Sequence, residues 1–231
     1  MASLVGVYAA SHGPMIAREW DSLTPPTRAS VEEGFGQVGK RLMASRADVL
    51  VIVSPDHWVN FFLNNFPAFC VGVGAEHDGP PEPFLKKHFH HPTLAGHSGL
   101  GNHIMNTAIE RDFDPSLSHR LTLDHGFCLP LWRMGLDPIP PIVPIVVNEV
   151  DDPMPTMRRC VDATECTWMN CYMKRPCKAN QVRTIDKLRS TNRFEYLYCW
   201  NIFISVVEQV RPRLRRNPLP VGLLRRVALG N

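Results

Sequence analysis

Short apolar runs alternate with one long amphipathic stretch in the first part of the chain. Residues 4–9 and 48–53 are apolar, and each run stops at turn-forming residues. Between them, Val31 and Phe35 belong to a set of apolar residues spaced as one face of a helix. The pattern predicts strand, helix and strand, with a Ser-x-x-Glu capping box at the helix start, beginning at Ser30.

The same alternation continues to about residue 160. Residues 69–73 and 142–147 are further strand candidates, and residues 100–111 and 127–134 have helical periodicity. Nearly continuous apolar strands that alternate with helices are typical of sheets buried on both faces. We therefore predict an α/β fold in which helices cover both faces of a mostly parallel central sheet.

The composition changes sharply near residue 155. Residues 1–155 carry 10 basic and 17 acidic side chains, a net charge of −7, whereas the remaining residues carry 15 and 5, a net charge of +10. No glycine occurs between Gly135 and Gly222, although tight turns commonly use it. We interpret residues 161–231 as a divergent basic, Cys/Arg-rich tail, either read in a shifted frame or disordered, with one helix over residues 196–210.

Length and local composition exclude several classes of protein. No apolar run reaches the roughly 20 residues that a membrane-spanning helix needs. The first residues lack the pattern of a secretory signal, so we expect a cytoplasmic protein whose seven cysteines are reduced thiols. The basic tail contains no nucleic-acid-binding motif, so we expect no nucleic-acid partner.

Two histidines lie just beyond the ends of predicted strands. His12 follows the first strand and His57 follows the second, each within a turn. Ligands of open α/β sheets bind at this carboxyl edge. Two imidazoles and one carboxylate form the facial site of non-haem Fe(II) oxygenases, so the pair is a candidate metal site. The alternative is that each histidine only caps its turn.

A third histidine, His125, lies in the segment Asp124-His125-Gly126 before an apolar helix. An imidazole with an ordinary pKa of about 6.5 is suited to transferring protons at neutral pH. The structural alternative is that Asp124 caps the helix and His125 belongs to its first turn.

Five segments, taken in order, resemble the class III extradiol ring-cleavage dioxygenases, specifically their catalytic B-type subunit. The resemblance runs from about residue 5 to residue 160, roughly two thirds of the chain. The segments are Ser11–Pro14, Ser54–Trp58, residues 61–74, Asp124–Phe127 with Pro130-Leu131, and Ile142–Asn148.

The resemblance implies a function and a set of site residues. It implies that His12 and His57 bind non-haem Fe(II), with zinc as the alternative metal, and that His125 is an acid/base residue near the substrate. The substrate is expected to be a small aromatic diol of the catechol type, cleaved with O2. Residues 1–160 would be the N-terminal part of the catalytic domain, and we expect either a homo-oligomer or a small partner subunit.

The sequence departs from the family after residue 160. The family's third iron ligand is a glutamate in the C-terminal half, and a second active-site histidine lies in a Gly-Gly-Leu-Ser-His type segment. This chain has no Gly-Gly pair and no histidine after His125, so we expect the C-terminal part of the fold to be incomplete. The alternative function is therefore a catalytically impaired or inactive remnant. Glu149, Asp151 and Asp152 are acidic substitutes that no motif supports.

Overall fold

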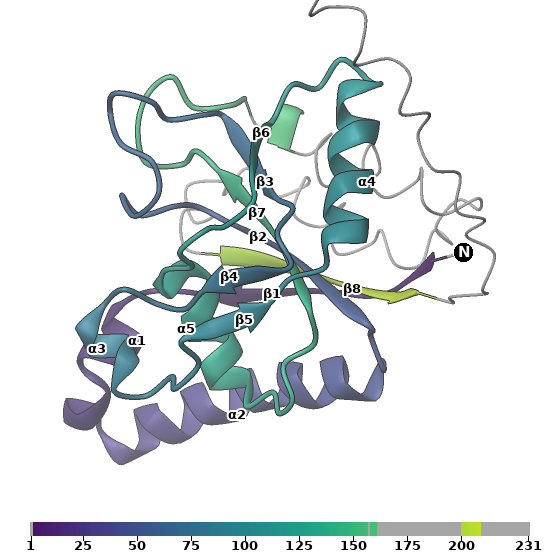
Figure 1. The fold of residues 1–231 in the computed structure, drawn as a ribbon. Coiled ribbons are helices and arrows are strands. Elements are labelled where there is room, and N and C mark those ends of the chain that lie inside the picture. The colour runs from purple at the N-terminus through teal and green to yellow at the C-terminus, as the bar shows by residue number, and fades with distance from the viewer. Residues whose placement is uncertain (1, 157, 161–199, 209–231) are drawn as a thin grey trace, which may run out of the picture.

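The computed structural model describes residues 2–156, 158–160 and 200–208 (Figure 1). Its main sheet has six strands in the order β1-β8-β2-β7-β3-β6, and β4 pairs with β5 in a second, small sheet. The strands are β1 (Ala2–Ser11), β2 (Val49–Ser54), β3 (Phe69–Gly72), β4 (Glu76–Asp78), β5 (Thr93–Ala95), β6 (Ser116–Ser118), β7 (Ile142–Val147) and β8 (Trp200–Glu208). The helices are α1 (Met15–Arg18), the 3₁₀ helix η1 (Trp20–Ser22), α2 (Pro25–Ala44), α3 (Pro83–Lys86), α4 (Ser98–Ile109) and α5 (His125–Met134).

The sheet is mixed, and three of its strands share one direction. β2 is parallel to β7, and β8 is antiparallel to both β1 and β2, so β1, β2 and β7 run the same way. β3 is antiparallel to β7, and β6 is parallel to β3. The carboxyl ends of β1, β2 and β7 therefore meet at one edge of the sheet.

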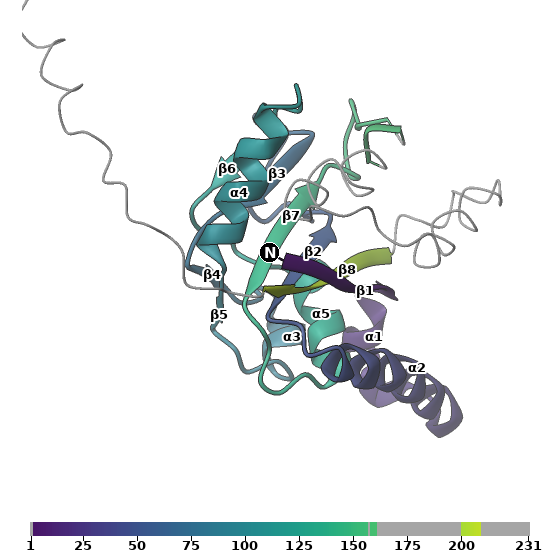
Figure 2. The ribbon, with the colours of Figure 1, turned by 90° about the vertical axis from the view of Figure 1, so that its right-hand side faces the viewer.

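Helices cover both faces of the sheet (Figure 2). Along β2, Leu50 and Ile52 pack into the cluster that includes α2 and α5. The alternate residues Val49, Val51 and Val53 pack into the cluster that includes α4. Every residue of β2 is buried, which is why its residues 49–53 are an unbroken apolar run. The predicted α/β class with helices on both faces is confirmed.

The predicted elements and the observed ones differ most at the start of the long helix. Helix α2 begins at Pro25, and Thr24 is its N-cap, with Oγ1 accepting from the backbone N–H of Thr27 at 3.4 Å. The predicted capping box at Ser30 is therefore wrong. Proline is favoured in the first turn of a helix because its fixed φ suits the helix and its missing N–H costs no hydrogen bond there.

The predicted helix over residues 196–210 is also wrong, because Trp200–Glu208 form strand β8. This strand lies between β1 and β2, and its Ile204 is the register partner of both Val7 and Val51. The segment is rich in isoleucine and valine, whose β-branched side chains favour extended backbone. Residues 161–199 and 209–231 lie outside the described residues, so the expectation of a divergent tail stays a prediction.

No helix in the described ranges could span a membrane.

Candidate active site

Three histidines from three separate segments meet at the shared carboxyl edge. His12 directly follows β1, His57 follows β2, and His125 is the first residue of α5. The ring centroids are 5.1 Å apart for His12 and His57, 4.1 Å for His57 and His125, and 6.1 Å for His12 and His125. His12 and His125 are buried, and His57 is partly exposed. The structure thus brings together all the histidines that the sequence singled out.

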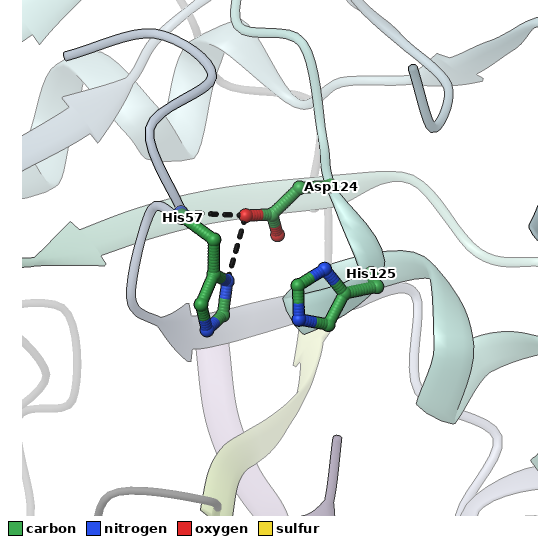
Figure 3. A group of neighbouring side chains, drawn as sticks. All are labelled: His57, Asp124 and His125. Carbon is green, nitrogen blue, oxygen red and sulfur yellow. Dashed lines mark hydrogen bonds and ion pairs between the residues drawn. The ribbon is translucent and has the colours of Figure 1, made fainter. Parts of the chain in front are cut away.

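Asp124 holds the ring of His57 (Figure 3). Its Oδ2 accepts from the backbone N–H of His57 at 2.7 Å and from the ring Nδ1 at 2.8 Å. Its Oδ1 accepts from the backbone N–H of Gly126 at 2.8 Å, which makes Asp124 the N-cap of α5 as well. A carboxylate can only accept, so Nδ1 carries the hydrogen and the lone pair of His57 is on Nε2.

Glu82 holds the ring of His125 in the same way. Its Oε1 accepts from the backbone N–H of His125 at 2.9 Å and from the ring Nδ1 at 2.8 Å. Glu82 immediately precedes α3 and lies in a proline-rich stretch. The sequence analysis missed this residue, because a single acidic side chain between prolines has no spacing that marks it as a partner of His125.

A further buried carboxylate fixes the loop that carries His57. Both oxygens of Asp56 accept backbone N–H groups at 3.1 Å, from residues 59–61. Asn60 then connects this loop to the segment before α5, since its side chain donates to the carbonyl of Thr122 and accepts from the Thr122 N–H, both at 2.8 Å. The loop of His57 is thereby tied to the segment that supplies Asp124 and His125.

The electrostatic setting of His57 favours a positive charge. Burial alone would lower the pKa of His57, but the hydrogen bond that its ring donates to Asp124 and the negative charges of Asp124, Asp56 and Glu82 outweigh it, so the pKa is raised. Burial would conversely raise the pKa of Asp124, yet the hydrogen bond and charge of His57 lower it. A cation bound at Nε2 would occupy the position that a proton takes in this pair.

Glu149, one of the acidic residues weighed from the sequence, lies two residues beyond β7. Its Oε2 is buried and has no hydrogen-bond partner within the described part of the chain. Burial raises the pKa of Glu149 to about 7, although the charge of His57 opposes this. Of the other two substitutes, Asp151 forms a turn with Asn148 through its backbone, and Asp152 is exposed.

The residue types at this edge suit a divalent metal ion. In the described ranges, one set of possible ligand atoms lies within 4.8 Å of one another, from His57, Asp124 and His125, and His12 is not in this set. Histidine ligands of metals usually donate their second ring nitrogen to a carboxylate or carbonyl, as His57 and His125 do here. Imidazole and carboxylate donors together suit Fe(II) and zinc.

Comparison with known proteins then decides the family. Residues 6–163 match the family described as the catalytic LigB subunit of aromatic ring-opening dioxygenase. The chain belongs to this LigB family. The resemblance found in the sequence to class III extradiol dioxygenases is thereby confirmed.

Curated relatives in the LigB family carry closely similar names. A protein of Dechloromonas aromatica (strain RCB), named 2,3-dihydroxyphenylpropionate/2,3-dihydroxicinnamic acid 1,2-dioxygenase 2, is 30% identical over 155 residues, covering 64% of this chain and 45% of the relative. A 2,3-dihydroxyphenylpropionate/2,3-dihydroxicinnamic acid 1,2-dioxygenase of Photorhabdus laumondii is 30% identical over 160 residues, covering 68% and 48%. This LigB-family chain therefore spans about half the length of the curated relatives it matches.

Proposed function

We propose that this LigB-family chain supplies the metal-binding half of an extradiol dioxygenase that cleaves the ring of a catechol-type substrate with O2. The observation that carries the proposal is the convergence of His12, His57 and His125 at one sheet edge. The names of the relatives support an aromatic diol as the substrate class. Both atoms of O2 enter the product when the ring bond beside the diol breaks, so no external reductant is consumed.

The proposal assigns His12 and His57 to the metal, which we take to be Fe(II), with zinc as the alternative. Asp124 supports this assignment for His57, because it occupies Nδ1 and leaves Nε2 as the donor atom. A metal bound there would supply Lewis acidity toward the diol and electron-transfer chemistry toward O2.

The proposal assigns His125 to proton transfer. Glu82 accepts the Nδ1 hydrogen of His125, so Nε2 is the basic atom of this ring. The centroid of His125 is 4.1 Å from that of His57, so a diol held at the metal would lie beside it. His125 would take a proton from a diol hydroxyl and later return it to an oxygen of the opening ring.

Anaerobic reconstitution of the full chain with Fe(II), followed by O2-uptake measurements, tests this function. The substrates are protocatechuate, a 3-substituted catechol and dihydroxyphenylalanine, and ring cleavage gives a yellow product. The variants H12A and H57A should lose bound iron, whereas H119A, which removes an exposed histidine, should keep it. Iron-loaded chain that consumes no O2 with any of these diols would support the inactive-remnant alternative instead.

A further inference from the structure

The loop after β7 places a carboxylate at the same sheet edge as the candidate metal site. β2 and β7 are parallel neighbours, and Ser54 is the register partner of Val146. His57 lies three residues beyond Ser54, and Glu149 lies three residues beyond Val146. The two residues therefore occupy equivalent sequence positions in the loops that follow two adjacent parallel strands.

The carboxyl group of Glu149 is the one near His57 whose hydrogen-bonding needs are least met. Asp124 uses both oxygens, for His57 and Gly126, and Asp56 uses both for the backbone of its own loop. One oxygen of Glu82 holds His125, and its other oxygen, Oε2, is buried without a partner in the described ranges. In the described ranges, the Oε2 atom of Glu149 is buried and has no hydrogen-bond partner.

A buried and unpaired carboxylate is costly unless a cation or a donor neutralises it. The nearby charge that interacts with Glu149 is that of His57, so the carboxylate and the imidazole lie in each other's field. A divalent ion on the histidines would supply the missing positive charge. Two imidazoles and one carboxylate are also a donor set that leaves metal positions open for substrate.

We propose that Glu149 is the carboxylate ligand that completes the metal site with His12 and His57. This inference rests on the proposed function, because it requires that these histidines hold the metal. Glu149 lies outside the tight cluster of His57, Asp124 and His125, so its side chain should turn toward His57 when the metal binds. The third metal ligand would then come from the N-terminal half of the fold.

Metal affinity of the full chain tests the proposal independently of activity. Fe(II) and Co(II) dissociation constants would be measured anaerobically by competition with a chromophoric chelator, for the wild type, E149Q, D152N and H57A. E149Q should bind the metal about 10-fold more weakly or worse, since even the loss of outer-shell partners costs about 10- to 100-fold. D152N, which removes an exposed carboxylate from the same loop, should bind the metal as tightly as the wild type does.

The visible spectrum of bound Co(II) provides a second measurement, because it responds to a change of ligand at the metal. E149Q should shift this spectrum, while circular dichroism should show that the fold is intact. If E149Q keeps both the wild-type affinity and the wild-type spectrum while H57A loses the metal, the role of Glu149 is refuted and the proposed function stands. If the wild-type chain binds neither metal, both are refuted.

Discussion

The unpaired carboxyl of Glu149 should make the metal-free protein less stable as the pH rises. Its pKa is raised from 4.5 to about 7 because burial disfavours the charged form. The folded state therefore binds this proton more tightly than the unfolded state does. The stabilisation is fully present below pH 4.5 and is lost as the pH rises through about 7.

The size of this effect follows from the difference between the two pKa values. At about 1.36 kcal/mol per pKa unit, a rise from 4.5 to about 7 corresponds to at most about 3 kcal/mol of unfolding free energy. The E149Q variant cannot ionise at this position and should not show that loss. The stability of E149Q minus that of the wild type should therefore increase by up to about 3 kcal/mol between acidic and mildly alkaline pH.

Urea unfolding followed by circular dichroism, in the presence of a chelator, measures this difference. Curves for the wild type, E149Q and D152N would be recorded from below pH 4.5 to above the pKa of about 7. D152N serves as the control because Asp152 is exposed. A stability difference between E149Q and the wild type that does not change with pH would refute the argument that the carboxyl oxygen Oε2 of Glu149 is buried and unpaired.

Four further variants test the proton-transfer residues and the packing of α2. H125A should keep its iron while turnover falls about 10²- to 10⁴-fold, the loss typical of missing acid/base help, as iron analysis and O2 uptake would show. E82Q should lower kcat about 10- to 100-fold and shift the pH profile of kcat at unchanged iron content; an unchanged profile would argue for a purely structural role. G39A should destabilise the protein by about 1–3 kcal/mol in thermal unfolding, because a Cβ there would collide with a backbone carbonyl of α5. G34A, in open space on the same helix, should stabilise it by up to about 1 kcal/mol instead.

The strands that carry the site could be predicted because their local sequences alone, apolar runs that end in turn-forming residues, indicate strands. Residues 142–147 were predicted as a strand with the observed bounds, and the apolar runs before His12 and His57 end in residues that stop strands. Directional rules for α/β sheets then place both histidines at one edge. His125 could be placed there only through the family resemblance, since its segment alone fits an ordinary helix start equally well.

Strand β8 and the carboxylate partners depend on tertiary contacts that no local pattern reveals. β8 pairs with β1 and β2, strands from the opposite end of the chain, and its length also suits a helix. Glu82 acts on a ring 43 residues away, and Asp124 acts on a ring 67 residues away. Of these two carboxylates, only Asp124 could be assigned a role from its local sequence, that of a helix cap. Its contact with His57 could not be predicted from that role.

The two carboxylate–histidine pairs show how this fold could give similar rings different tasks. In both pairs a single carboxylate oxygen accepts the backbone N–H and the Nδ1 hydrogen of the same histidine, so both rings have Nε2 as their basic atom. The tautomer therefore does not distinguish a metal ligand from a proton acceptor here. Their positions differ. His57 follows strand β2 at the sheet edge beside His12, and the equivalent position after β7 is Glu149, whereas His125 begins a helix that packs on one face of the sheet. The sheet would thus define the metal site, and the helix would present the base to a substrate bound there.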